Sequence, residues 1–218
     1  MEPSFVTWFG SRGIKPYLET TLNIDRVSAK ISCLFSEHKN SNASTTRQQI
    51  RSSAQTWIPP PCLSFKIKVD ATVGPYFSSM AAVVRDWRGE LVFVNIMKVN
   101  TTLPLQAEVE AIKWGLSLAP AIGNECIIVE SNCQYCVQLL NDLASPPPWR
   151  IKSLCSDLRN MVSVSDKFCV KWVPKLCNAA APSLAKWSLS CNFFGLFDIG
   201  NSPACFSSII LEESNRAL

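Results

Sequence analysis

Three side chains that could bind a metal ion or act on a phosphate occur where predicted strands and helices begin or end. Asp70 ends the predicted strand 65–70, Glu108 lies in the first turn of a predicted helix, and Asn132 directly follows a predicted strand. Carboxylate and amide oxygens are ligands for hard cations such as Mg²⁺. Each acid also has a purely structural interpretation, because Asp is common in turns and an acid near a helix start interacts favourably with the helix dipole.

A pair of cysteines suggests a different chemistry. Cys133 and Cys136 are separated by two residues, follow a predicted strand and open a predicted helix, which is the context of thioredoxin-like redox sites. The chain contains ten cysteines, so this spacing can also arise by coincidence. The sequence has no second pair with this spacing and only one histidine, which argues against a zinc site.

These side chains must be positioned by an α/β fold. Alternating apolar and polar residues and short apolar runs predict strands, whereas apolar stripes at helical spacing predict helices. The predicted strands cover 65–70, 80–85, 91–99, 126–130 and 168–173, and the predicted helices cover 105–119, 132–143, 150–162 and 181–189. This order predicts a mixed five-stranded sheet, an antiparallel three-strand meander followed by βα units, with helices on its faces.

The predicted topology brings the three candidate ligands together. Ligands of such sheets gather at the carboxyl ends of strands, where the strand order changes direction. If the strand that ends at Asp70 pairs in parallel with the strand 126–130, Asp70 and Asn132 lie side by side at that edge. Glu108, near the start of the crossover helix, leans over the same position.

The chain divides into three parts. Residues 1–56 lack sustained apolar periodicity and are expected to form a disordered or poorly structured leader. Three consecutive prolines, 59–61, mark the entry to a domain over 57–189, and residues 190–218 are expected to form an irregular C-terminal tail. No apolar run is long enough to span a membrane, and the start of the chain lacks a secretory signal. We therefore expect an intracellular protein, nuclear or cytoplasmic rather than secreted.

The composition describes a folded chain without a strong charge bias. Hydrophobic residues make up 47% and charged residues 17% of the 218 residues, unlike a chain that is disordered throughout. The net charge of +4 permits a polyanionic partner but does not indicate one. Six basic residues could contact phosphates or could simply form a solvated surface. They are Lys66, Lys68, Arg150, Lys152, Lys171 and Lys175.

Several short motifs, taken in their order and spacing, resemble the ribonuclease H fold. The resemblance is closer still to the ribonuclease H-like domains of plant non-LTR retroelements and their host-encoded relatives, the type 1-like branch associated with reverse transcriptases. It covers roughly residues 57–195. The motifs are WIPPP at 57–61, KVDA at 68–71, AVVRDWRG at 82–89, QAEVEA at 106–111, WGL at 114–116, VESNCQ at 129–134, WVPK at 172–175, Asn178, and LAKW at 184–187.

The resemblance implies an endoribonuclease for RNA–DNA hybrids in which four acids hold two Mg²⁺ ions, or Mn²⁺ in their place. By motif, Asp70 is the ligand shared by both ions and Glu108 is the second acid. Asn132 and Pro182 stand where the family pattern has Asp, and Pro182 offers no side-chain ligand. The histidine that assists in many relatives has no counterpart, because the only histidine is His38 in the leader. The resemblance therefore implies metal binding by Asp70, Glu108 and Asn132 that is weak or absent, and catalysis that is impaired.

Three functions remain open at this point. One is a nucleic-acid-binding domain for RNA–DNA hybrid or RNA with weak or lost hydrolysis. Another, more remote, is a redox protein that uses the cysteine pair. The main alternative to nucleic-acid binding is a protein-interaction module in which the aromatic residues of the tail dock a partner, although these residues could equally pack on their own domain. The aromatic residues concerned are Phe193, Phe194, Phe197 and Phe206.

Overall fold

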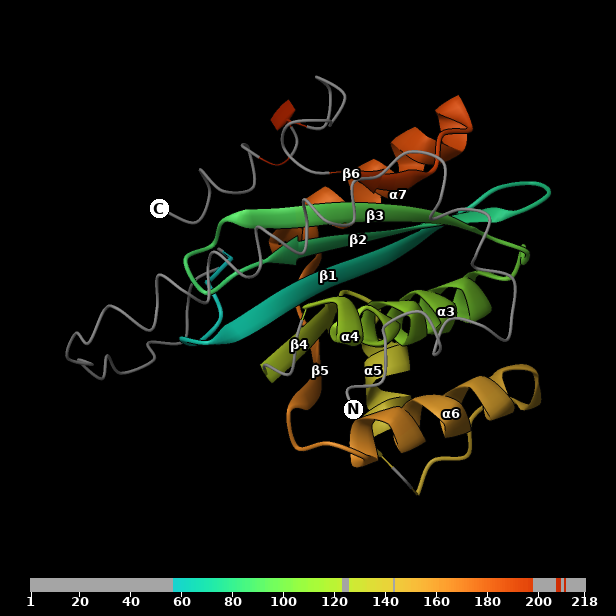
Figure 1. The fold of residues 1–218 in the computed structure, drawn as a ribbon. Helices are drawn as coiled ribbons and strands as arrows, with labels where there is room; N and C mark the ends of the chain where they lie inside the picture. The colour runs from blue at the N-terminus through green and yellow to red at the C-terminus, as the bar shows by residue number, and fades with distance from the viewer. Residues whose placement is uncertain (1–56, 123–125, 143, 198–206, 209, 211–218) are drawn as a thin grey trace, which may run out of the picture.

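The computed structural model describes residues 57–122, 126–142, 144–197, 207–208 and 210, and these form a mixed sheet with helices on both faces (Figure 1). The leader expected over 1–56 lies outside the described residues. The strands follow the order β5-β4-β1-β2-β3-β6 across the sheet. Their bounds are β1 Ser64–Val73, β2 Ser78–Arg85, β3 Leu91–Val99, β4 Cys126–Ser131, β5 Phe168–Trp172 and β6 Gly195–Phe197. β1 is antiparallel to β2 and parallel to β4, so the predicted α/β fold and the central place of the strand carrying Asp70 are confirmed.

Helices cover both faces of this sheet. Figure 1 shows α3, α5 and α6 on one side and α7 on the other. The helices are α3 Pro104–Ser117, α4 Ala119–Ile122, α5 Gln134–Asn141, α6 Lys152–Ser163 and α7 Ala180–Cys191, with 3₁₀ helices η1 Trp149–Ile151 and η2 Lys175–Asn178. Within the described ranges, no helix is both long enough and apolar enough to cross a membrane.

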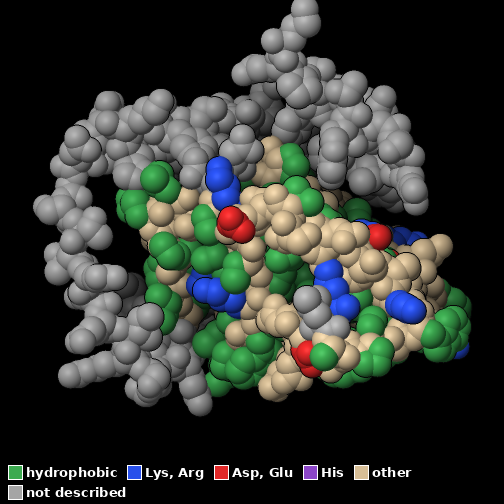
Figure 2. All heavy atoms as spheres, turned by 90° about the horizontal axis from the view of Figure 1, so that it is seen from below, with side chains coloured by type: hydrophobic (Ala, Val, Ile, Leu, Met, Phe, Trp, Pro, Cys, Tyr) green, Lys and Arg blue, Asp and Glu red, His purple; other side chains and the backbone are tan. Residues whose placement is uncertain are grey.

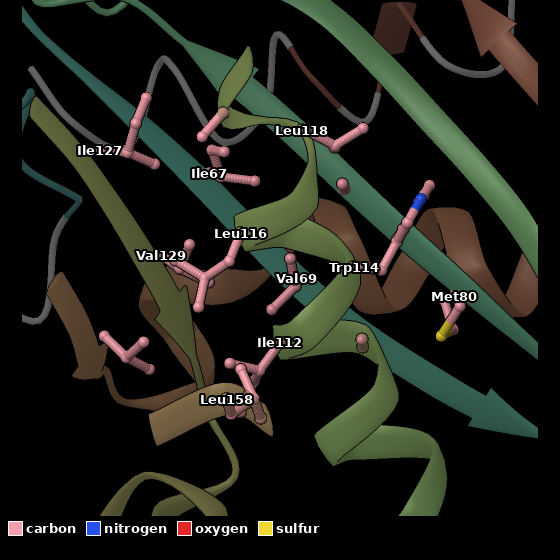
Figure 3. Packing of buried hydrophobic residues seen from close by; sticks show 14 of the residues in the cluster. Ile67, Val69, Met80, Ile112, Trp114, Leu116, Leu118, Ile127, Val129 and Leu158 are labelled. Atoms are coloured by element: carbon pink, nitrogen blue, oxygen red, sulfur yellow. The ribbon is translucent and has the colours of Figure 1, made fainter. Parts of the chain in front are cut away.

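The larger hydrophobic core lies between the sheet and α3. Val69 of β1 packs in one buried cluster with Ile112 and Leu116 of α3 (Figure 3). A Cβ atom at Gly115 would lie 2.8 Å from Cγ1 of Val69, closer than real Cβ atoms come to a neighbour. Glycine at this position therefore allows α3 to approach β1 closely next to Asp70. A smaller core lies between α7 and strands β2 and β3.

β1 continues past the predicted strand end at Asp70. Its pairing with β4 stops at Val69, opposite Ser131, whereas its pairing with β2 continues to the end of β1. The chain turns back only at Gly74, whose N–H donates to the carbonyl of Phe77 at 2.9 Å. Asp70 is therefore not a turn residue. It lies inside the strand, at the first position beyond the reach of β4.

The lysines of β1 do not form a solvated or phosphate-binding face, so that prediction is wrong. Lys66 is 7% exposed and Lys68 is 1% exposed. The Nζ of Lys66 lies 2.8 Å from a carboxylate oxygen of Glu130 and donates to the carbonyl of Ile58 at 2.6 Å. Lys68 donates to the carbonyl of Cys177. The alternating pattern of β1 was interpreted as one apolar and one solvent-exposed face, but both faces of this central strand are covered. Buried oxygen atoms accept hydrogen bonds from the lysine amines.

Trp57 covers three buried basic side chains, those of Lys66, Lys68 and Arg85. Its ring centre lies 5.5 Å from Nζ of Lys66, 5.3 Å from Nζ of Lys68 and 5.3 Å from Cζ of Arg85. These distances suit cation–π contacts. Gly89, with φ of 85°, lies under the same ring, because a Cβ there would be 3.1 Å from it. The start of the predicted domain is thus part of its packed interior.

A sixth strand lies in the segment expected to be an irregular tail. β6 pairs antiparallel with β3. Phe193 stacks on Phe197 with ring centres 5.4 Å apart and meets Trp187 of α7 edge-on at 5.6 Å. The tail aromatics up to Phe197 therefore pack on their own domain, while Phe206 lies outside the described residues. The prediction of five strands is corrected to six, because three residues are too few to show strand periodicity.

Candidate functional site

The candidate site is centred on Asp70, where β4 ends beside β1. Ser131 is the last residue of β4 and pairs with Val69, so Asn132 comes level with Asp70. Asp70 is 5% exposed. Burial raises the pKa of its carboxyl to about 7, although a hydrogen bond from the Asn132 side chain and the charge of Lys175 oppose this shift. The buried carboxyl therefore holds a proton part of the time at neutral pH.

Glu108 is the second acid at this site. It is the fifth residue of α3, which has no acid in its first turn, so the predicted first-turn position is wrong. The helix begins at Pro104, which sets Glu108 one turn in. Burial, then the negative charges of Asp70 and Cys133, raise the pKa of Glu108 to about 9. Its Oε2 is buried and has no hydrogen-bond partner among the described residues. A proton or a cation would satisfy this oxygen.

Asn178, in η2, fixes the orientation of the Asn132 amide. Its Nδ2 donates to the carbonyl of Val69 at 3.0 Å and to Oδ1 of Asn132 at 2.6 Å. The Val69 carbonyl can only accept, so Asn178 must present its amino group there. The same amino group then requires an oxygen from Asn132. The amino group of Asn132 is consequently the part that faces Asp70, where its hydrogen bond lowers the pKa of the acid.

Pro182 contributes no ligand atom. It is the third residue of α7, which begins at Ala180, so the proline lies in the first turn as predicted. Its missing N–H is tolerated there, because the first N–H groups of a helix have no partner within the helix. Of the four residues selected from the sequence, the structure thus brings Asp70, Glu108 and Asn132 together and leaves Pro182 without a side-chain role.

The cysteine pair belongs to the rim of the same site. Cys133 is the N-cap of α5, and its Sγ lies 3.1 Å from Sγ of Cys136. The hydrogen bond with Cys136 and backbone N–H groups of the helix start lower the pKa of Cys133 to about 6. That same hydrogen bond and burial raise the pKa of Cys136. The charge of Cys133 acts on both Asp70 and Glu108, a proximity that the sequence analysis did not anticipate.

The residues of this site fit one divalent cation better than two. The carboxylates of Asp70 and Glu108 repel each other, and a cation between them would relieve that repulsion and satisfy the unpaired Oε2 of Glu108. Mg²⁺ demands several oxygen ligands in near-octahedral order. No group of three or more His, Cys, Asp or Glu side chains that could hold a metal ion occurs in the part of the chain that the structure describes.

Two residues near Asp70 had no assigned role in the sequence analysis. Asn178 appeared there only among the family motifs, and Lys175 only in the motif at 172–175 and as one of several basic residues. Both lie in η2, shortly after β5, which is parallel to β4. The carboxyl end of β5 lies at the same edge of the sheet as that of β4. Their position after this third parallel strand was the available signal.

Solved structures with this arrangement of strands and helices are RNase H1 domains. LC11-RNase H1, isolated from compost by a metagenomic approach, matches with a TM-score of 0.55 and 14% identity over 60% of this chain and 98% of that chain. Its complex with an RNA/DNA hybrid matches with a TM-score of 0.52 and 15% identity over 59% of this chain and 98% of that chain. RNase H1 from Halobacterium salinarum matches with a TM-score of 0.50 and 20% identity, over 59% and 98% of the two chains. At these identities the likeness shows the fold alone, an RNase H fold.

The sequence defines the family more closely than the fold does. The model of the reverse transcriptase-like family matches residues 68–188, which is more than half of the chain. This chain belongs to that family. No curated protein sequence matches it.

Proposed function

We propose that this chain is an RNase H-like domain that binds RNA–DNA hybrid or RNA, and that its hydrolytic activity is weak or lost. Its family and its fold support the nucleic-acid part of this proposal, because an RNase H1 of the same fold has been solved with an RNA/DNA hybrid. The sequence motifs at 57–61, 82–89 and 129–134 support a place in the plant retroelement branch of the family.

The impaired activity is supported by the Asn132 amide. An ion bound to Asp70 needs oxygen ligands around it, yet Asn132 directs an N–H donor at this carboxylate. The oxygen of Asn132 already accepts a hydrogen bond from Asn178 at 2.6 Å. Pro182 supplies no oxygen at the fourth position. Binding a second ion would therefore require breaking the hydrogen bonds that hold Asn132.

A single Mg²⁺ or Mn²⁺ would be held by Asp70 and Glu108, and when bound it would stabilise negative charge on a phosphate. Protons compete with the cation for the carboxylate oxygens of Asp70 and Glu108. Each acid holds a proton at higher pH than an ordinary carboxyl does, with pKa values of about 7 and about 9. The cation must displace these protons. Binding should therefore be weak below neutral pH and should strengthen as pH rises.

A groove beside the site offers room for a nucleic-acid strand. It has a volume of about 870 Å³, and Tyr135, Lys171 and Trp172 contribute to its lining. Trp172 is 45% exposed, and its Nε1 donates to the backbone carbonyl of Asn132 at 3.3 Å. Exposed aromatic rings of this kind stack on unpaired bases. On the face seen in Figure 2, lysine and arginine side chains are spread out and do not gather into one basic patch.

Cleavage of an RNA–DNA hybrid tests the catalytic half of the proposal. The unmodified chain should cleave little with Mg²⁺ or Mn²⁺, and Asn132→Asp combined with Pro182→Asp should raise cleavage well above the parent. Asp70→Asn in the restored chain should abolish the gain, because it removes the shared ligand. The proposal is wrong if the parent already cleaves at the rate of the restored variant and loses that activity on Asp70→Asn.

Binding of single-stranded RNA without metal tests the other half, because only unpaired bases can stack on an aromatic ring. Trp172→Ala should weaken binding by about 1–3 kcal/mol if the ring stacks on a base. Trp149→Ala is the matched control, because Trp149 is 79% exposed and contacts Arg150 rather than the residues of the site. Fluorescence anisotropy with a labelled single-stranded RNA measures the affinity of both variants. Equal affinities for the two variants would contradict the placement of the strand in this groove.

A further inference from the structure

We propose that Cys133 and Cys136 form a reversible disulfide, which makes the rim of the Asp70–Glu108 site a place of covalent redox modification. Both cysteines are free thiols in the structure. Their sulfur atoms are 3.1 Å apart. A disulfide bond is about 2.05 Å long, so closure requires the two sulfurs to move together by about 1 Å.

The side chain of Cys133 can make that movement. Cys133 is the N-cap of α5: its carbonyl accepts from the N–H of Val137 at 3.2 Å and its N–H donates to Oγ of Ser131 at 3.1 Å, so its backbone is held and the movement is a rotation of its side chain. Cys136 lies in the first turn of α5 and is 1% exposed. The movement therefore falls on Cys133, the half-buried member, while Cys136 stays fixed in the core.

Because Cys133 is more exposed than Cys136, Cys133 reacts first and Cys136 second. Cys133 is the thiol that a soluble oxidant reaches, and the oxidant proposed is a small-molecule disulfide such as oxidised glutathione. The Cys133 sulfur, after losing its proton to solvent, attacks one sulfur of the small disulfide and releases one glutathione thiol. The Cys136 sulfur then loses its proton and attacks Cys133, which forms the protein disulfide and releases the second glutathione thiol. Two protein thiols are oxidised and one small disulfide is reduced to two thiols.

The disulfide would form next to a residue of the candidate site. Cys133 directly follows Asn132, the residue whose amide is fixed between Asn178 and Asp70. A disulfide would close a short ring immediately after Asn132 and tie this connection between β4 and α5 to the core through Cys136. The proposal does not depend on nucleic-acid binding, since its readout is the state of two sulfur atoms.

Peptide mass spectrometry after thiol trapping tests the proposal. The full chain, first reduced, is equilibrated with glutathione buffers of increasing oxidised fraction, quenched in acid, unfolded in denaturant and alkylated. The expected result is the loss of both alkylation sites at 133 and 136, a linked peptide lighter by two hydrogen atoms, and recovery of both sites with dithiothreitol. Cys191→Ser, which removes an exposed cysteine of α7, should leave this link unchanged.

Two variants separate the steps. In Cys136→Ser, Cys133 should accumulate as a mixed disulfide with glutathione, because no second thiol resolves it. In Cys133→Ser, Cys136 should stay alkylatable only after unfolding, because it is buried. The proposal is overturned if the parent keeps both thiols, or only a glutathione adduct at Cys133, in fully oxidised glutathione. It is also overturned if Cys136 links to another cysteine as readily in Cys133→Ser as it does to Cys133 in the parent.

Discussion

Two acids with an incomplete set of partners lie at the centre of the candidate site, at the scale of single residues. Asp70 is buried and Glu108 is half-buried beside it, and Asn132 and Lys175 supply the compensation that Asp70 receives. Burying a carboxylate without full compensation favours its protonated form. At neutral pH the two acids therefore bind protons at the position where the family pattern has a metal ion. This protonation makes the free energy of unfolding depend on pH.

The stability of the fold should fall as pH rises through the neutral range. The pKa of Glu108 is about 9 in the folded chain against an ordinary 4.5, so between these values the folded state binds more protons than the unfolded state. Stability then decreases with increasing pH. Glu108→Gln removes the part of this dependence that Glu108 carries, while Asp70, whose pKa is about 7, keeps its own part. At pH 8 the variant should have a free energy of unfolding higher than that of the parent by up to about 5 kcal/mol, with little change near pH 4.5.

Urea unfolding of parent and variant at several pH values measures this effect. Glu90→Gln is the control, because Glu90 is an exposed acid in the turn between β2 and β3. Its substitution should leave the pH dependence of the parent unchanged. If Glu108→Gln follows the same pH curve as the parent, the burial of this acid does not carry the energetic cost described.

At the scale of elements, the site exists because β1 runs past the ends of β4 and β5, which stop level with each other at Ser131 and Trp172. β4 stops beside Val69, so β1 runs on past it and exposes one edge. Asn178 of η2 binds the Val69 carbonyl at that edge, and so takes the place of the next residue of β4. α3 carries Glu108, and its approach to β1 depends on Gly115. The spacing between the two acids is thus set by a contact about two turns along the helix.

Gly115→Ala should destabilise the protein, opposite to the usual effect in a helix. Alanine in place of glycine inside a helix ordinarily adds up to about 1 kcal/mol of stability. Here the new Cβ would lie 2.8 Å from Cγ1 of Val69 and 3.4 Å from Cγ1 of Val129. Overpacking of this kind costs about 1–3 kcal/mol. In a Val69→Ala background the cost should shrink, and a double-mutant cycle by urea unfolding measures the coupling. Additive effects would show that this contact does not set the spacing.

At the scale of the whole molecule, the order of elements was predictable from local pattern. Alternation in β1 and the helical stripe of α3 are strong signals, whereas the parallel pairing of β1 with β4 was a condition of the predicted site, which the structure fulfils. The burial of Lys66 and Lys68 was not predictable, because their partners Ile58 and Cys177 are distant in sequence or irregular in structure. β6 depends on the edge of β3 and leaves no local pattern. The convergence around Asp70 was predictable from strand ends, whereas the direction of the Asn132 amide required Asn178 in place.

The domain should depend strongly on its first described residue. Trp57 is 5% exposed and covers three basic side chains. Trp57→Ala should lower the free energy of unfolding by about 3–5 kcal/mol, because it removes a large buried ring. Trp149→Ala should change it by less than about 0.5 kcal/mol, since that ring is largely exposed. Urea unfolding compares the two. Similar midpoints would mean that the segment before β1 is not part of the folded unit.

The overhang of β1 beyond β4 also determines where the sheet opens first. The carbonyl of Val69 points to the β4 side, where Asn178 binds it. Peptide groups alternate in direction along a strand, so the N–H groups of Ala71 and Val73 point to that same side, past the end of β4. Amide hydrogens there should exchange with deuterium faster than those of Asp70 and Thr72, which point toward β2. Fluctuation of the central strand would then begin at its functional end, with Asp70 at the boundary between the protected and the exchanging part.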